Sequence, residues 1–137
     1  MEVRIQHLGG VKFAAATRGH RVISDQPASN GGSDTGMTPP ELLLASLGTC
    51  GGFYAAQYLR NHSLECPDLE VLVSAEKAKA PARLGTFKME VIAPGIAPEH
   101  EPGMLRAVQA CLIHNTLLHT PSIETSVHCL APSYNAV

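Results

Sequence analysis

The sequence predicts an α+β fold in which antiparallel sheets surround two helices, in the approximate order βββ-α-ββ-α-β. Short segments with alternating apolar side chains come in pairs separated by turn residues, which is typical of antiparallel hairpins. Between these pairs, residues 38–60 form a long apolar stretch with a helix start signal, and a shorter amphipathic helix follows later. No repeat or linker interrupts the 137 residues, so we expect a single domain spanning residues 1–137.

The first segments predict an antiparallel meander followed by a loop. Residues 2–8 and 11–15 alternate in polarity, and the pair Gly9-Gly10 between them indicates a hairpin turn. Residues 21–24 add a third short strand. The polar stretch 25–37 is rich in glycine, serine and aspartate, so we expect a long loop that is functional or wraps a neighbour.

Residues 38–60 predict the central helix of the domain. Thr38 at the N-cap and Glu41 three residues later form a capping box, and Pro39 suits the first helical position. No charged residue occurs between Glu41 and Arg60, and apolar side chains cover nearly every side. We expect a helix with this pattern to be buried on all sides.

Glycines cluster around a cysteine in the middle of this helix. Gly48, Gly51 and Gly52 surround Cys50, although a glycine in a helix interior costs about 1 kcal/mol relative to alanine. We therefore expect close approach of another backbone, from a second helix or a second subunit. Aromatic residues make up only 4% of the sequence, so small aliphatic side chains form the core. Such a core favours completion by a partner subunit, as a homodimer.

The second half of the chain predicts a hairpin, a helix and a last strand. Apolar residues alternate over 69–76 and again over 87–91, which indicates two paired strands. Apolar residues at helical spacing over 104–112 predict the second helix, with Cys111 on its inward face. Residues 123–127 alternate again and predict the final strand.

Charge and targeting signals restrict the class of protein. The net charge is −2 and the basic residues are scattered, so we expect no nucleic-acid partner. The N-terminus lacks a signal pattern, and glycine and polar residues interrupt the long apolar stretch. We therefore expect a cytoplasmic protein without membrane association. Structural disulfides are rare in that reducing compartment.

The cysteines are the candidate residues for chemistry. Cys50 and Cys111 lie on predicted inward helix faces, either as small core side chains or as a dithiol that can close to a disulfide. Cys66 and Cys129 are expected to be bystanders. His114 follows Cys111 by three residues, but the sequence has no CxxC or HExxH pattern. We therefore expect neither a metal nor a cofactor.

Two sequence runs, GMTPPELLLASLGTCGG and ACLIHNTL, resemble the OsmC/Ohr family of osmotically inducible and organic hydroperoxide resistance proteins, and RGHRVISDQP before them supports this. The resemblance covers residues 13–127, in the PELLL variant. It implies an OsmC-like fold completed as an intertwined homodimer with active sites at the interface. It also implies a thiol-dependent peroxidase for organic hydroperoxides in oxidative stress defence. Cys50 would attack the peroxide, Cys111 would resolve the sulfenic acid as a disulfide, and a dithiol reductant such as a lipoyl group would regenerate both.

The resemblance further implies an arginine from the early strands and a glutamate at the helix start. Arg18 is the match for the arginine, with Arg21 as the alternative. A nearby positive charge would lower the pKa of the attacking thiol. Glu41 is the match for the glutamate, but the best-known members carry theirs one residue earlier, where this chain has Pro40. Glu41 is therefore either a catalytic residue or only the capping-box glutamate.

Apolar side chains around Cys50 are the candidates for substrate binding. On the central helix these are Leu43, Leu47, Phe53 and Tyr54, and the later helix adds Leu105, Val108 and Leu112. Such walls favour an alkyl or aryl group over a small polar peroxide. The alternative function is a non-catalytic protein that binds a small apolar ligand at the dimer interface. The second thiol favours the enzyme, because a pure binding protein has no need of it.

Overall fold

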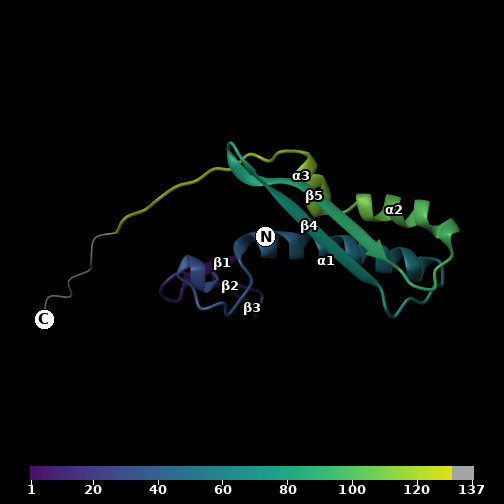
Figure 1. The fold of residues 1–137 in the computed structure, drawn as a ribbon, viewed down its shortest axis with the longest axis horizontal. Coiled ribbons are helices and arrows are strands. Elements are labelled where there is room, and N and C mark those ends of the chain that lie inside the picture. Colours follow the sequence, from purple (N-terminus) through teal and green to yellow (C-terminus); the bar gives the residue numbers. More distant parts are fainter. Residues whose placement is uncertain (131–137) are drawn as a thin grey trace, which may run out of the picture.

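The computed structural model describes residues 1–130, and it has two antiparallel sheets, one of which packs along the longest helix while the other lies near the start of that helix (Figure 1). The α+β fold predicted from the sequence is therefore confirmed. In chain order the elements are β1 (Arg4–His7), β2 (Phe13–Thr17), β3 (His20–Ser24), the 3₁₀ turn η1 (Ala28–Asn30), α1 (Pro39–Asn61), β4 (Glu70–Lys79), β5 (Ala82–Ile92), the 3₁₀ turn η2 (Pro98–His100), α2 (Glu101–Gln109) and α3 (Leu112–Leu118).

Both sheets are antiparallel. The N-terminal sheet has the order β1-β2-β3, with Ala15 opposite both Ile5 and Val22. The second sheet is the hairpin β4-β5, in which Val73 lies opposite Met89. Both strands of this hairpin run further than the alternating pattern predicts, because an irregularity after Ala75 shifts the register and lets the pairing continue.

Helix α1 begins at the predicted capping box. The carboxylate of Glu41 accepts hydrogen bonds from the backbone N–H of Thr38 at 2.7 Å and from its hydroxyl at 2.8 Å. Pro39 occupies the first helical position, where a missing N–H costs nothing. The helix then runs for 23 residues along the β4-β5 hairpin (Figure 1).

The helix glycines allow the hairpin to approach α1 closely. A Cβ on Gly48 would lie 2.9 Å from a methyl group of Val73, and one on Gly51 would lie 2.7 Å from the sulfur of Met89. The sequence predicted the approach of another backbone to these glycines, but within the chain their close neighbours are side chains, chiefly those of the hairpin.

Burial of α1 on all sides, which the sequence predicted, is not found in this chain. Its buried residues recur every fourth position, at Leu47, Gly51, Ala55 and Leu59, and form one stripe. The opposite side is open, and Phe53 there is 60% exposed. The hydrophobic core lies at the far end of α1, where Ala55 and Leu59 pack on Met104 and Val108 of α2.

Two predictions about the C-terminal half are wrong. The second helix does not continue through Cys111, because the chain turns extended there and separates α2 from α3. Residues 123–127 do not form a strand, and Ile123 and Val127 are more than 80% exposed. Within residues 1–130 no strand lies beside this segment, so its backbone has no ladder to join.

The loop after β3 is organised by one buried carboxylate. Asp25 is 1% exposed and accepts hydrogen bonds from the backbone N–H groups of Gln26, Ser33 and Thr35 and from the Thr35 hydroxyl. The ammonium group of Lys12 lies 3.8 Å away. The Thr35 hydroxyl, together with the three N–H groups, outweighs the effect of burial and holds the pKa of Asp25 well below its usual range.

Within residues 1–130, none of the helices combines the length and the hydrophobicity that crossing a membrane requires.

Candidate active site

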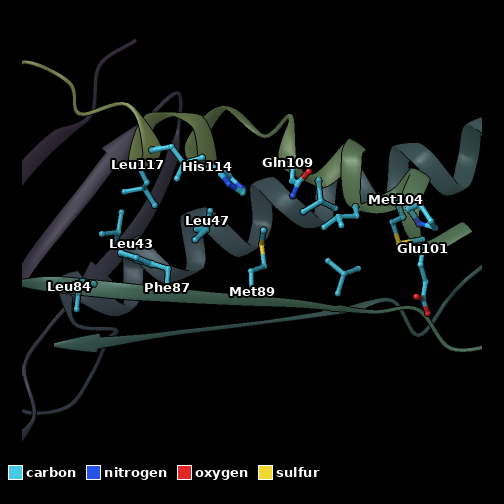
Figure 2. A pocket seen from close by; sticks show the side chains of 16 residues that line it. Leu43, Leu47, Leu84, Phe87, Met89, Glu101, Met104, Gln109, His114 and Leu117 are labelled. Atoms are coloured by element: carbon cyan, nitrogen blue, oxygen red, sulfur yellow. The ribbon is translucent and has the colours of Figure 1, made fainter. Parts of the chain in front are cut away.

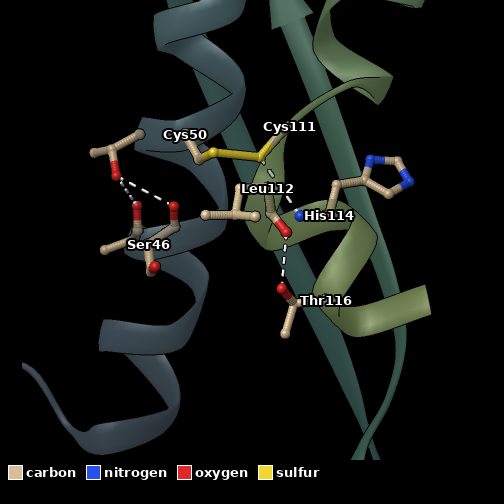
Figure 3. Close-up of a disulfide and its surroundings, with 8 residues drawn as sticks. Ser46, Cys50, Cys111, Leu112, His114 and Thr116 are labelled. Atoms are coloured by element: carbon tan, nitrogen blue, oxygen red, sulfur yellow. Dashed lines mark hydrogen bonds between the residues drawn. A yellow bond between two sulfur atoms is a disulfide. The ribbon is translucent and has the colours of Figure 1, made fainter. Parts of the chain in front are cut away.

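Cys50 and Cys111 are joined by a disulfide where α1 meets the start of α3 (Figure 3). Their Cα atoms are 5.9 Å apart, although 61 positions separate them in the sequence. Cys50 lies in the middle of α1, and Cys111 is the N-cap of α3. The break between α2 and α3 therefore places the second cysteine against α1, and the structure brings together the two residues predicted to form a dithiol.

The two sulfurs of this pair have different surroundings. Cys111 is fully buried, and its sulfur accepts a hydrogen bond of 3.5 Å from the backbone N–H of His114 (Figure 3). Cys50 is only half-buried. Ser46 and Thr49, its neighbours on α1, are exposed. In the single chain the disulfide is therefore less covered on the α1 side.

A large apolar groove of about 990 Å³ lies close to this part of the chain, and neither cysteine of the pair is among the residues that line it (Figure 2). Its walls come from α1, β5, α2 and α3. Leu47 in its wall precedes Cys50 by three residues, and Gln109 and His114 flank Cys111 in sequence. The polar lining side chains are Glu101, Gln109 and His114, and the others are apolar. The groove can therefore hold an apolar group, and sequence neighbours of both cysteines contribute to its walls.

Some of the predicted substrate-binding residues line this groove. Leu43 and Leu47 do so from α1, and Leu105 and Val108 do so from α2. The residues that lie outside it are Phe53, Tyr54 and Leu112. The ring of Phe53 packs edge-on against Tyr54, with ring centres 5.3 Å apart, and Leu112 is 62% exposed.

The sequence interpretation did not assign the floor of the groove, which β5 supplies. Phe87, Met89 and Val91 alternate along this strand and point to the same face. The alternation was visible in the sequence and predicted a half-buried strand. Helix α1 packs over that face and leaves space toward α3. This arrangement depends on tertiary packing, which the alternating pattern of one strand does not predict.

The arginine candidates lie in the N-terminal sheet. Arg18 is at the tip of the β2-β3 hairpin with a φ of 51°, and Arg21 is in β3 opposite Ala16. In the described part of the chain, neither arginine forms an ion pair or a side-chain hydrogen bond. The structure of the single chain does not bring either guanidinium group to the cysteine pair.

Glu41 is placed by its hydrogen bonds to Thr38 at the start of α1. The Thr38 backbone N–H and hydroxyl hold the pKa of the Glu41 carboxyl below its usual value. Nine residues separate it from Cys50, which is about 13 Å along a helix axis. Its observed contacts are those of a helix cap.

The remaining cysteines lie away from this site. Cys66 is half-buried, and its thiol donates a weak hydrogen bond to the carbonyl of Pro94 at 3.5 Å. Cys129 is exposed in the segment after α3. In the described residues, His, Cys, Asp and Glu side chains do not gather in groups of three that could hold a metal ion.

Solved structures share this fold. A protein of Psychrobacter arcticus 273-4, named for an osmotic stress induced and detoxification response, has a TM-score of 0.76 at 16% identity, covering 83% of this chain and 85% of that one. An OsmC like protein from Mycoplasma pneumoniae has a TM-score of 0.66 at 19% identity, with coverages of 88% and 89%. An organic hydroperoxide resistance protein OsmC from Legionella pneumophila has a TM-score of 0.60 at 15% identity, with coverages of 87% and 90%. At these identities the likeness is one of fold.

The family assignment comes from the sequence match. None of the curated proteins compared matches the chain significantly. A family model described as OsmC-like protein matches residues 31–126, which is more than half of the chain and includes both cysteines of the pair. The resemblance predicted from the PELLL and ACLIHNTL runs is confirmed, and the chain belongs to the OsmC-like family.

Proposed function

We propose that this protein is a thiol-dependent peroxidase that reduces organic hydroperoxides in the cytoplasm, as part of oxidative stress defence. The observation that carries the proposal is the meeting of Cys50 and Cys111, whose sequence neighbours Leu47 and His114 line an apolar groove. Membership in a family related to stress and redox functions agrees with it. A buried pair of structural cysteines would need no such groove.

The proposed reaction uses each cysteine once. The thiolate of Cys50 attacks the outer oxygen of the hydroperoxide, the O–O bond breaks, and the alcohol leaves after taking a proton. Cys50 is then a sulfenic acid. The thiol of Cys111 attacks its sulfur, water leaves, and the disulfide seen in the structure results. A dithiol such as a lipoyl group reduces this disulfide and is itself oxidised.

The groove supports a preference for bulky substrates. Leu43, Leu47 and Met89 offer apolar contacts to an alkyl or aryl group, and each buried methylene contributes about 0.8 kcal/mol. Hydrogen peroxide has no such group and gains nothing from these walls. Phe53 and Tyr54, which lie outside the groove, would contact substrate only if a partner subunit enclosed them.

We further propose an intertwined homodimer as the working form. Apolar side chains of the N-terminal sheet are exposed in the single chain, with Ile5 at 60%, Phe13 at 40% and Val22 at 45%. The strands of this sheet contact one another, but they make few contacts with α1, the β4-β5 hairpin, α2 or α3 (Figure 1). A second chain covering these surfaces would bring its Arg18, or else its Arg21, to the Cys50 thiolate. Glu41 would act chiefly through the helix cap.

Peroxide consumption by the purified protein tests the proposal. With cumene hydroperoxide and either dithiothreitol or dihydrolipoamide, we expect many turnovers per protein molecule. Cys50→Ser should abolish them, whereas Cys66→Ser, which removes a thiol outside the pair, should leave them intact. If the unmodified protein consumes no cumene hydroperoxide with either dithiothreitol or dihydrolipoamide, the proposal is contradicted.

The size and character of the groove favour one second candidate, a non-catalytic protein that binds a small apolar ligand. The two functions predict different results for Cys50→Ser. A peroxidase variant without its nucleophile loses turnover, but a binding protein has no turnover to lose. Calorimetric binding of cumyl alcohol to a protein that shows no peroxide consumption would favour the second candidate.

A further inference from the structure

Two of the four methionines line the apolar groove. Met89 reaches it from β5 and Met104 from α2, whereas Met1 and Met37 are not among the residues that line it. Met104 is 7% exposed and belongs to the hydrophobic core, but Met89 is only half-buried. A methionine thioether is readily oxidised to a sulfoxide. A groove that holds a hydroperoxide therefore brings an oxidant to Met89.

The thioether of Met89 packs directly against the backbone of α1. Met89 extends from β5 toward this helix (Figure 2), and its sulfur fills the space above Gly51, the residue that follows Cys50. A Cβ on Gly51 would lie 2.7 Å from the sulfur of Met89, 3.2 Å from its methyl carbon and 3.5 Å from a methyl group of Val108. These contacts are made within one chain, so the proposed homodimer does not remove them.

We propose that Met89 is a modification site, at which an organic hydroperoxide held in the groove oxidises the thioether to a sulfoxide. This inference rests on the proposed function, because the oxidant is the proposed substrate of the same groove. The oxidant arrives as the ligand of the groove, so the modification does not require that Met89 be exposed to solvent. Met37 lies outside the groove and gains nothing from a ligand held there.

The oxygen transfer balances with the organic hydroperoxide as the only oxidant. A lone pair of the Met89 sulfur attacks the outer oxygen, an S–O bond forms and the O–O bond breaks. The proton of the hydroperoxide passes to the leaving alkoxide, and the alcohol departs. Sulfur loses two electrons, and the hydroperoxide gains them. The Cys50 thiolate competes for the same oxidant, so Met89 is oxidised chiefly while Cys50 and Cys111 are joined in the disulfide.

A sulfoxide at Met89 disturbs the packing next to Cys50. It is polar, and it carries an oxygen that the thioether lacks. The sulfur already lies where a single carbon added to Gly51 would not fit. The new oxygen must therefore either push against α1 or turn into the groove, where it replaces an apolar contact. Both results impair the alignment of a bound substrate with Cys50, so the modification lowers peroxide turnover.

Mapping the sulfoxides in the disulfide form tests the proposal without peroxide turnover. The protein is first oxidised with diamide, then treated with either cumene hydroperoxide or hydrogen peroxide, digested and analysed by peptide mass spectrometry. The ratio of sulfoxide at Met89 to sulfoxide at Met37 corrects for the different reactivities of the two oxidants. We expect this ratio to be at least about tenfold higher with cumene hydroperoxide, because the groove holds only that oxidant.

Cys50→Ser, which removes the competing thiolate, should give the same ratios without diamide. Equal ratios for the two oxidants, or a higher ratio with hydrogen peroxide, would overturn the proposal. Equal ratios in a protein with normal turnover would refute the modification site and leave the peroxidase standing. A raised ratio at Met89 in a protein without turnover would refute the peroxidase and keep the modification site.

The effect of the sulfoxide on turnover is measured separately. The disulfide form, in which both cysteines are protected from over-oxidation, is treated with cumene hydroperoxide, freed of it, and assayed with dithiothreitol. Wild type and the control Met37→Leu should lose activity in proportion to the sulfoxide at Met89. Met89→Leu conserves the side-chain volume but cannot form a sulfoxide, so it should keep its own starting rate. An equal loss in Met89→Leu, or full activity in wild type that carries the sulfoxide, would overturn this effect.

Discussion

The N-terminal sheet and the body around α1 differ in how much of their structure one chain completes. The body, formed by α1, the β4-β5 hairpin, α2 and α3, has a buried core and brings the two cysteines together. The sheet β1-β2-β3 has correct strand pairing but leaves its large apolar side chains exposed. The comparison indicates that the cysteine pair is assembled within one chain, whereas the activation by arginine that we propose would require a second chain.

The largest expected effect concerns the body, through Cys111→Ser. Without a second thiol, Cys50 should be oxidised once by cumene hydroperoxide and then stall or proceed to sulfinic acid. Mass spectrometry of the product and turnover with a monothiol reductant measure this. Cys129→Ser is the control, because it removes an exposed thiol outside the pair. If Cys111→Ser turns over at the normal rate with a monothiol alone, Cys111 does not resolve the sulfenic acid.

A mutation in the sheet should have the next largest effect. Arg18→Ala is expected to lower kcat/KM roughly a hundredfold and to raise the pKa of the Cys50 thiol, because a positive charge near the thiolate is lost. Arg21→Ala is measured in parallel, and a larger effect there than at Arg18 would assign the role to Arg21 instead. Steady-state kinetics and the pH dependence of Cys50 alkylation provide the measurements.

Mixed dimers then show which chain supplies the arginine. Homodimers of Arg18→Ala should be strongly impaired and those of Cys50→Ser inactive, but a heterodimer holds one intact site if Arg18 acts across the interface. We expect activity to return on subunit exchange. No recovery in verified heterodimers would place the arginine in the same chain as its cysteine, contrary to the comparison above.

The packing of α1 on its hairpin predicts opposite effects at two neighbouring glycines. Gly48→Ala would place its Cβ 2.9 Å from Val73, a stiff β-branched side chain, so we expect a loss of about 1–2 kcal/mol in the free energy of unfolding. Gly52→Ala meets Val71 at 3.4 Å, an ordinary contact, and should gain about 0.5–1 kcal/mol from helix propensity. Urea unfolding measures both, and equal effects would contradict the packing.

The last prediction concerns the stability of the loop that follows the sheet. Asp25→Asn should lower the melting temperature at pH 7, because the amide replaces a carboxylate that accepts four hydrogen bonds. The pKa of Asp25 is lower in the folded than in the unfolded state, so this stability is present above the unfolded pKa. It should fade as the pH falls below about 4.

The control for Asp25→Asn is Asp34→Asn, in the same loop. Asp34 is exposed and has a φ of 54°, which asparagine tolerates. The Asp34→Asn protein should therefore have the melting temperature of the wild type at every pH. A difference between wild type and Asp25→Asn that stays constant down to pH 2 would show that the ionised carboxylate is not the source of the stability.

Local patterns in the sequence predicted most of the elements. The capping box at Thr38 and the alternation in the two hairpins are local signals, and each corresponds to an observed element. The break at Cys111 was not predicted, because apolar residues continue through it at helical spacing. The sequence predicted that α1 is buried on all sides, but only one stripe is buried within the chain. An apolar helix face does not show whether the element that packs on it belongs to the same chain.

The candidate site was predictable to a similar degree. The family resemblance identified Cys50 and Cys111 as a pair, and the structure places them together. Leu43 and Leu47 line the groove as predicted, but its floor at Phe87 and Met89 depends on how the hairpin crosses α1. The way the hairpin packs across α1 is tertiary structure, and the alternating pattern of a strand does not predict it.

Substrate preference tests the central claim most directly, because it depends on both the cysteine pair and the groove beside it. The measurement is kcat/KM for cumene hydroperoxide and for hydrogen peroxide, on one preparation with dithiothreitol. The apolar walls at Leu43, Leu47 and Met89 should favour the bulky substrate by at least about tenfold, since transition-state binding includes its aryl group. Equal values, or a preference for hydrogen peroxide, would contradict the account and make the groove lining ordinary core.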